Sequence, residues 1–431
     1  MRLIVYKLLL SLIFPFYLPL LWLNNRLKGR SANWWLGDWQ SKFEPGTTWL
    51  WVYTPSAGEV LIAQTFLKEL SAAYPEQQYL IIAGTHSGFQ MASRVFGDRA
   101  AVVYLPLDFG MMIRRLLANY PPAGQLIIES EFRPNLIGAL GKLGVGQALV
   151  NGKITERTAA RYRKIGFFLR EVLAYLQLFC MQTPADAAAI IGLGAAPDRV
   201  DVVGNAKFDQ EFKPLAGAEK ERLSELLGLT PQTRLLVAGS THAGEEAIVI
   251  ESFQAIATVY PETVLLIAPR NLERVAEVGS LLEQAGVAYQ RRSQLPLDIV
   301  RARVVLLDTM GELTAFYGLA DLAFVGGSLV AVGGHNIIEP AAMGCPVLFG
   351  DQLQNFTAAR DLLVENGVGF TVRDGSELTA CCLELLGDPE RRSQVGEAAQ
   401  RLIATNRGAA VKTIKRLKAT GIVVGGGHDN S

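Results

Sequence analysis

Three acidic side chains of the first half of the chain follow apolar runs that read as strands. Glu59 stands in the segment TPSAGEVL, and Glu129 and Glu131 stand in the segment LIIESEFRPN. Functional groups of α/β proteins gather at the carboxyl ends of parallel strands, so Glu59 could act there as a general base. The competing interpretation is that Glu59 only complements the dipole of the next helix and caps it.

Glu129 and Glu131 end the same apolar run, and the alternation of a strand places both on one side of it. Two acids that leave a buried strand need partners or a shifted pKa. The basic residues that could pair with them are Arg133, Arg157, Arg161 and Arg163. Lys207, in VVGNAKFD, follows the last strand of this half. It is either a solvated surface lysine or a cation that meets a leaving phosphate.

The stretch 321–350, DLAFVGGSLVAVGGHNIIEPAAMGCPVLFG, contains two glycine pairs after an apolar strand. We expect His335 and Asn336 to open a short helix with Glu339 in its first turn. Unpaired N–H groups and the dipole at a helix start favour an anion, which predicts a phosphate near residues 333–337. Glu339 is suited to a sugar hydroxyl. Alternatively, the glycines only permit tight turns.

Three further strand-to-helix junctions could complete a nucleotide-sized rim in this half. Ser240 or Thr241 precedes a helix that begins near Glu245, and either could be its cap. The other two junctions carry Pro269 with Arg270, and Met310 with Gly311 and Glu312. An arginine at such a position could grip a phosphate or a base.

The elements that position these residues are short, continuous apolar runs, which are typical of parallel strands buried on both faces. The strands predicted for the first domain are 49–53, 78–83, 101–105, 125–129, 147–150, 178–181 and 200–203. Those predicted for the second are 235–238, 264–268, 287–290, 304–307, 322–325, 347–349 and 369–372. We therefore expect an α/β protein with two Rossmann-like domains, 31–208 and 209–431, and an active site in the cleft between them.

Composition narrows the classes of function. The 431 residues carry 41 basic and 41 acidic side chains, so no nucleic-acid partner is indicated. The four cysteines lack metal or redox spacing and lie in apolar segments, as in a reducing compartment. With four scattered histidines, no protein-built metal site is expected.

Residues 1–30 combine an apolar run with flanking basic residues, which predicts an N-terminal membrane-anchor helix.

Eight segments resemble, in order and spacing, the motif blocks of the bacterial lipid A Kdo (3-deoxy-D-manno-octulosonic acid) transferases. They are SAGE, ESEFRPN, GNAKFD, STHAGEE, PRN, DTMGEL, LAFVGGSL and GGHNIIEPA. The resemblance covers nearly the whole chain. It implies a metal-independent, inverting glycosyltransferase of the GT-B type, without a cofactor, that moves Kdo from CMP-Kdo to a lipid A precursor. The family works at the cytoplasmic face of the inner membrane.

Carried over residue by residue, the resemblance makes Glu59 the general base and assigns stabilisation of the transition state to Glu129 and Lys207. The residues that match the CMP site are Pro269, Arg270, Met310, Gly311, Glu312, Gly334, His335, Asn336, Ile337, Ile338 and Glu339. Glu131, Ser240 and Thr241 are additional candidates.

The chain departs from the family pattern at Arg133, Lys153 and Asn271. Two of these substitutions add positive charge near the expected acceptor side. A GT-B enzyme with another nucleotide sugar or acceptor, an epimerase of that fold and an inactive binding protein therefore remain alternatives. The number of Kdo residues transferred cannot be read from the sequence.

Overall fold

The computed structural model describes residues 47–105, 107–212, 215–295 and 302–422. It divides into two compact units, one made of the described residues up to Gln210 together with those from Asn406, and one of Glu211–Thr405. None of the helices in the described ranges is long and apolar enough to cross a membrane. The predicted anchor, residues 1–30, lies outside these ranges.

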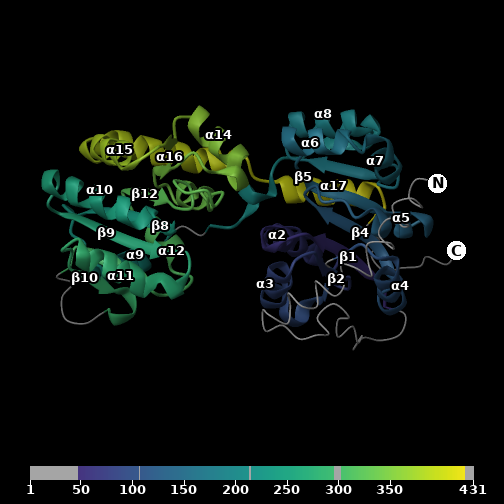
Figure 1. Ribbon diagram of the computed structural model, residues 1–431, viewed down its shortest axis with the longest axis horizontal. Coiled ribbons are helices and arrows are strands. Elements are labelled where there is room, and N and C mark those ends of the chain that lie inside the picture. Colours follow the sequence, from purple (N-terminus) through teal and green to yellow (C-terminus); the bar gives the residue numbers. More distant parts are fainter. Residues whose placement is uncertain (1–46, 106, 213–214, 296–301, 423–431) are drawn as a thin grey trace. The chain divides into compact units, whose positions relative to one another are not determined.

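The first unit contains a seven-stranded parallel sheet with the order β3-β2-β1-β4-β5-β6-β7. Its strands are β1 (Trp49–Thr54), β2 (Gln78–Ala83), β3 (Ala101–Tyr104), β4 (Pro122–Ile128), β5 (Gln147–Gly152), β6 (Leu178–Met181) and β7 (Val200–Val202). Its helices are α2 (Ala57–Ala73), α3 (His86–Phe96), α4 (Gly110–Asn119), α5 (Pro134–Lys142), α6 (Glu156–Arg163), α7 (Gly166–Leu173), α8 (Pro184–Leu193) and α17 (Ala409–Ala419) (Figure 1).

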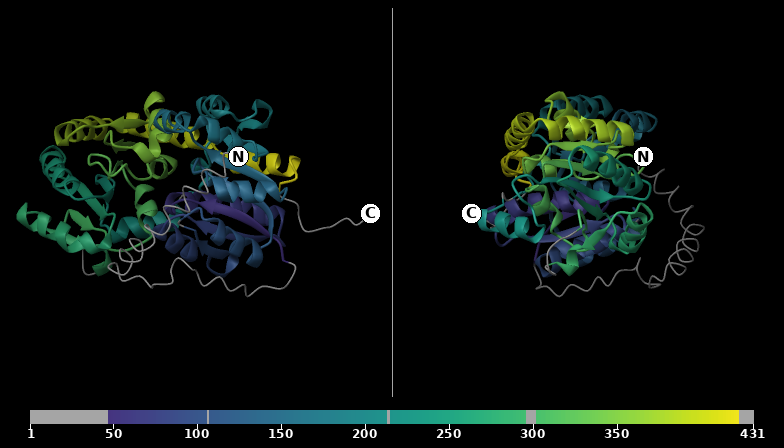
Figure 2. Two further views of the ribbon diagram at one scale, coloured as in Figure 1. Left: turned by 45° about the vertical axis from the view of Figure 1, so that its right-hand side comes forward. Right: turned by 90° about the vertical axis from the view of Figure 1, so that its left-hand side faces the viewer.

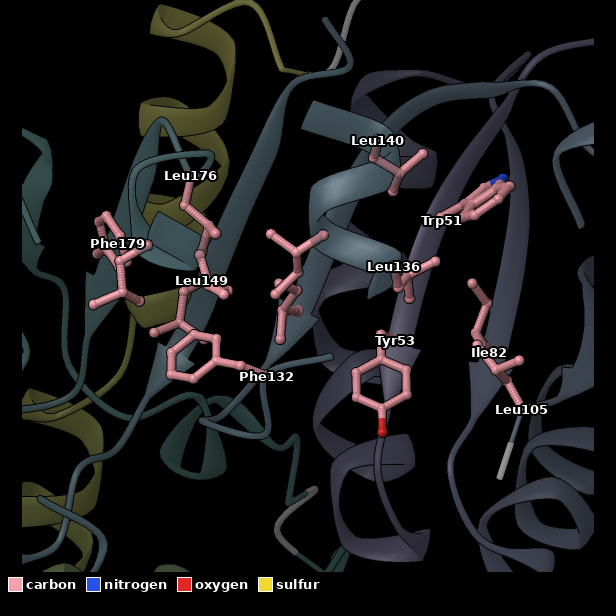
Figure 3. Close-up of a cluster of buried hydrophobic side chains, with 14 of the residues drawn as sticks. Trp51, Tyr53, Ile82, Leu105, Phe132, Leu136, Leu140, Leu149, Leu176 and Phe179 are labelled. Carbon is pink, nitrogen blue, oxygen red and sulfur yellow. The ribbon is translucent and has the colours of Figure 1, made fainter. Parts of the chain in front are cut away.

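Alternate residues of each strand enter two different cores, one on each face of this sheet. Trp51 and Tyr53 of β1 pack with residues of α4, α5, α7 and α8, whereas Leu50 and Val52 pack with residues of α2, α3 and α17. Figure 3 shows Trp51 and Tyr53 on the same side of the sheet as Leu136 of α5. Burial on both faces explains why the strands are continuous apolar runs in the sequence.

The second unit repeats this architecture with the strand order β10-β11-β9-β8-β12-β13-β14, again parallel throughout. Its strands are β8 (Arg234–Thr241), β9 (Thr263–Pro269), β10 (Tyr289–Arg291), β11 (Val304–Leu306), β12 (Leu322–Val325), β13 (Val347–Phe349) and β14 (Gly369–Thr371). Its helices are α9 (Gly217–Leu226), α10 (Glu245–Val259), α11 (Val275–Gln284), α12 (Leu313–Tyr317), α13 (Ile338–Ala342), α14 (Thr357–Glu365), α15 (Gly375–Gly387) and α16 (Pro389–Thr405). One core of this unit lies between the sheet and α10, α11 and α15.

The two parallel sheets confirm the predicted α/β class with two Rossmann-like domains. Every predicted strand occurs, although β4 begins at Pro122 and ends at Ile128, whereas the prediction was 125–129. The predicted short helix occurs as the five-residue α13, but its start was predicted wrongly, because it begins at Ile338 and not at His335. Glu339 does lie in its first turn.

The segment from Asn406 belongs to the first unit, whereas the sequence-based division placed it in the second. In Figures 1 and 2 its helix α17, in yellow, lies among the blue elements of the first unit. Asp209 fixes the start of α17, because its carboxylate accepts hydrogen bonds from the N–H groups of Gly408 at 2.6 Å, Ala409 at 3.3 Å and Ala410 at 2.5 Å. Beyond α17, a Cβ added at Gly124 of β4 would stand 2.4 Å from a backbone oxygen at residue 422. The backbone at residue 422 therefore packs closely against β4 of the first unit.

Candidate active site

Glu59 forms a capping box at the start of α2. The Ser56 N–H donates to its Oε2 at 2.8 Å, the Ser56 hydroxyl donates to the same oxygen, and the Ser56 oxygen accepts from Gly58 N at 3.4 Å. The capping interpretation is therefore right for the local structure. It leaves the carboxylate partly exposed at the carboxyl end of β1, with its position held by two hydrogen bonds.

Glu129 lies directly after β4 with φ of 63°, a left-handed conformation that is costly for a residue with a side chain. Its carboxylate stands 3.8 Å from the ammonium of Lys207. Burial raises the pKa of Glu129, the charges of Lys207 and Lys153 oppose this rise, and the charge of Glu59 adds to it. The structure thus brings all three predicted catalytic residues, Glu59, Glu129 and Lys207, into one electrostatic group.

Parallel strands explain why residues so far apart in the sequence meet. Glu59, Glu129 and Lys153 follow β1, β4 and β5, which are neighbours in the sheet, so all three leave it at the same edge. Lys153, which the sequence marked only as a departure from the family pattern, joins this group through its charge on Glu129.

Two asparagines that the sequence analysis did not single out position the turn that carries Lys207. Lys207 lies in the 3-10 helix η3 (Ala206–Asp209), and its N–H donates to the Asn205 side chain at 3.0 Å. The Asn151 side chain, at the end of β5, accepts from Ala206 N at 2.9 Å. In the sequence, the only sign of this positioning role was that the two asparagines stand in the segments NGK and GNAKFD.

Glu131 has different partners from Glu129. It accepts from the Tyr53 hydroxyl at 2.9 Å and forms an ion pair with Arg133 at 2.7 Å. Figure 3 shows the Tyr53 oxygen at the outer end of the ring, away from the core residues above it. Ion pairing with Arg133 is therefore confirmed for Glu131. The alternation assumed for the two acids does not hold, because β4 ends at Ile128 and Glu129 takes a left-handed turn.

In the second unit, Arg270 directly follows β9 and interacts electrostatically with residues of the glycine-containing stretch 321–350. Its N–H donates to the Thr241 carbonyl at 3.0 Å. Its charge acts on both His335 and Glu339. Burial raises the pKa of Glu339, while a hydrogen bond from the Thr314 hydroxyl and the charge of Arg270 oppose this rise. Arg270, His335 and Glu339 thus form a second electrostatic group.

The histidine of this group is paired with a second one. The Nε2 atoms of His335 and His242 are 2.7 Å apart, and the two rings are stacked with an interplanar angle of 5°. One nitrogen must donate and the other accept. Burial lowers the pKa of His335 to about 4, and the charges of Arg270 and His242 lower it as well, so this ring is neutral at pH 7. The Asn336 side chain accepts from Ile338 N at 3.2 Å, just before the five-residue helix α13, whose N-cap position is Ile337.

Ser240 and Thr241 do not cap α10, because both belong to the end of β8 and Gly244 precedes the helix. A break in the strand register separates Gly239 from Thr241, and Ser240 has φ of 55°. The hydroxyl of Thr241 is buried and has no hydrogen-bond partner among the described residues. The structure therefore corrects the helix-cap interpretation of these two residues.

The third junction forms a smaller cluster. Glu312 pairs with Arg292 at 2.7 Å and accepts from the Thr309 hydroxyl. Gly311 has φ of 85°, and Met310 is 69% exposed. Within the residues that the structure describes, no hydrogen bond or ion pair joins Glu312 to Arg270 or His335. In the described parts of the chain, no three His, Cys, Asp or Glu side chains lie together so that they could hold a metal ion.

Comparisons with known proteins identify the family. Residues 19–210 match the family model described as 3-deoxy-D-manno-octulosonic-acid transferase (kdotransferase). The chain is 34% identical to the 3-deoxy-D-manno-octulosonic acid transferase of Bordetella pertussis, over 93% of this chain and 96% of that protein. It is 32% identical to the enzyme of the same name from Haemophilus influenzae, over 86% of both chains.

A solved structure agrees in fold. UDP-GlcNAc 2-epimerase from Neisseria meningitidis superposes with a TM-score of 0.58 at 13% identity, covering 86% of this chain and 100% of that one. At this identity the likeness shows the fold alone. Together with the two parallel sheets, it makes this a GT-B type protein. The long, nearly full-length matches show that the chain belongs to the 3-deoxy-D-manno-octulosonic acid (Kdo) transferase family and is a glycosyltransferase.

Proposed function

We propose that this transferase moves Kdo from CMP-Kdo to a hydroxyl of a lipid A precursor, with inversion at the anomeric carbon and without a metal ion. The observation that carries the proposal is the group formed by Glu59, Glu129 and Lys207, in which two carboxylates and an ammonium share one edge of the first sheet. An acceptor alcohol is neutral and needs a base, whereas a phosphate leaving group needs positive charge and N–H groups.

In this mechanism Glu59 takes the proton of the acceptor hydroxyl as its oxygen attacks the anomeric carbon. The bond between that carbon and the phosphate oxygen of CMP breaks, and its electron pair leaves with CMP. A single displacement inverts the anomeric centre and requires no covalent intermediate. We assign stabilisation of the transition state to Glu129 and Lys207. Lys207 also provides the cation that a buried carboxylate such as Glu129 needs.

The donor is assigned to the second unit, where Arg270 can neutralise the phosphate and Glu339 can accept from a sugar hydroxyl. The neutral His335 beside them can donate or accept a hydrogen bond without adding charge. Cationic side chains can balance the leaving CMP, so the proposed reaction needs no divalent ion. Activity that persists in excess EDTA supports this part, and activity that EDTA abolishes and Mg²⁺ restores contradicts it.

Arg133 gives no reason to assign a different acceptor. Its charge is balanced by Glu131 at 2.7 Å, and its Nε donates to the Tyr53 oxygen at 2.6 Å. The positive charge of Arg133, where the chain departs from the family pattern, is therefore paired within the protein. Lys153 differs, since it acts on the group around Glu129 and can influence the acceptor directly.

The decisive experiment incubates the full-length protein with a lipid A precursor and either CMP-Kdo or a UDP-sugar. We expect CMP release and, by mass spectrometry, a lipid product heavier by one or more Kdo residues, with CMP-Kdo only. Transfer from a UDP-sugar would favour the alternative GT-B transferase. NMR of the product's anomeric carbon tests inversion.

We also propose that the protein works at the cytoplasmic face of the inner membrane, where a lipid acceptor would be reached. The apolar residues and flanking basic residues of the segment 1–30 support this location. Recovery of the full-length protein in the inner-membrane fraction, and in the soluble fraction when residues 1–30 are removed, is the expected result.

A further inference from the structure

Glu245 is a fully buried acid at the first position of α10, with none of its surface exposed. Its Oε2 accepts from the backbone N–H groups of His242 at 2.9 Å and Gly327 at 2.7 Å. Its Oε1 accepts from those of Ser328 and Leu329, each at 2.9 Å. An ionised carboxylate has about four acceptor sites, and four backbone N–H groups bind to this one.

These four bonds join two loops that are distant in the sequence. His242 belongs to the loop after β8, whereas the other three donors belong to the loop after β12. Consecutive N–H groups of a glycine-containing turn form a concave site for anions. In this protein the internal carboxylate of Glu245 occupies that site after the first glycine pair, so a ligand phosphate cannot use the same donors.

The clamped loops also hold the histidine pair. The His242 N–H bonds to Glu245, and the His242 ring bonds to His335 at 2.7 Å. Gly327 lies against both rings, because a Cβ added there would stand 3.0 Å from Cδ2 of His335 and 3.4 Å from Cδ2 of His242. The Gly327 carbonyl accepts from Gly334 N at 2.8 Å. Glu245 thus fixes both neighbours of His335 and one residue of the second glycine pair.

We propose that Glu245 is a positioning residue of the donor site: it fills the first glycine loop as an internal anion and thereby holds His335 and the second glycine pair for the donor nucleotide. The inference rests on the proposed function, since it takes CMP to be bound around His335. Glu245 acts through these groups and touches no substrate.

The adjacent acid offers a matched control. Glu246 is also fully buried and lies in the same helical turn, but its partner is Arg274, which pairs with Glu277 as well at 2.7 Å. Replacing either acid by glutamine removes one buried negative charge from the start of α10. Only the change at Glu245 places an amide NH₂ group against the N–H donors of the glycine loop.

The experiment compares full-length wild type, Glu245→Gln and Glu246→Gln by calorimetric titration with CMP, by thermal unfolding and by kinetics with CMP-Kdo varied. We expect Glu245→Gln to weaken CMP binding by about tenfold or more, because buried donors then face each other. The KM for CMP-Kdo should rise by a similar factor, with kcat and the acceptor KM close to wild type. Glu246→Gln should bind CMP as wild type does, even where its Tm falls.

Wild-type CMP affinity in a folded Glu245→Gln protein overturns the inference and leaves the proposed function standing. Equal weakening in both variants also overturns it, since the effect would then be a general loss of structure. If Glu245→Gln does not fold, Glu245→Asp decides: the shorter acid keeps the charge but cannot reach all four donors, so CMP affinity should still fall, and unchanged affinity refutes the role. A wild type that binds no CMP refutes the donor assignment itself.

Discussion

The two roles open to Glu59, helix cap and general base, can be separated by paired substitutions. Glu59→Gln keeps an oxygen that can accept from Ser56 but removes the ability to take a proton. Ser56→Ala removes the hydroxyl that bonds to Gly58 and to Glu59 but leaves the carboxylate in place. Ser56→Ala therefore damages the capping box and keeps the base, whereas Glu59→Gln keeps an acceptor for the capping box and loses the base.

The expected magnitudes are far apart. Loss of a cap costs about 1 kcal/mol, which lowers the Tm of a unit of this size by about 2–4 °C. Loss of a general base lowers the rate by about 10²–10⁴-fold. We expect Ser56→Ala to show the small fall in Tm and Glu59→Gln to unfold close to the wild-type Tm, and only Glu59→Gln to show the large loss of transfer. Its affinity for CMP should not change, because the donor residues belong to the other unit.

The assay is CMP release from CMP-Kdo in the presence of lipid acceptor, measured beside thermal unfolding and CMP titration for each variant. If Glu59→Gln lowers the rate of transfer by less than about tenfold, the loss is smaller than removal of a general base should cause. That result would refute the assignment. Equal losses of transfer in Ser56→Ala and Glu59→Gln would also refute it, since the cap alone would then explain the effect.

Three further predictions test other parts of the structure. Lys207→Met removes a charge that opposes the raised pKa of Glu129, so this pKa should rise further; if transfer needs ionised Glu129, the acid limb of the pH–rate profile should move to higher pH. Gly327→Ala should weaken CMP binding and lower the Tm, because φ is 67° there and the added Cβ would crowd His335; calorimetry and thermal unfolding measure both effects. Asp209→Ala should destabilise the protein by about 1–3 kcal/mol in urea unfolding without changing CMP affinity, since three N–H groups lose their carboxylate partner.

The fold was predictable because burial on both faces leaves a continuous apolar run for each strand. The charged group of the first unit was predictable in part, because Glu129 directly follows such a run and Glu59 lies in the first turn of the helix after another. Its partner Lys153 was not, since only the order of strands in the sheet brings β5 beside β4.

The second unit shows where sequence patterns fail. Glycine pairs and an Asn predicted a helix from His335, but the helix begins only at Ile338, with Ile337 at its N-cap position. The role of Glu245 depends on four backbone donors from two loops, and no local pattern reports such contacts. Similarly, nothing in the composition of α17 shows that it leaves the second unit, because its apolar stripe would suit either core.

The return of α17 makes the second unit an insertion within the first, and this affects how the protein is made. A ribosome releases residues 211–405 before it releases Leu417, whose side chain is fully buried in the first unit's core. The unit whose synthesis starts first is therefore the last to be completed. Until α17 has been released, the apolar side chains that it covers in the first unit stay open to water, so a nascent chain stalled after Thr405 should be a substrate for chaperones.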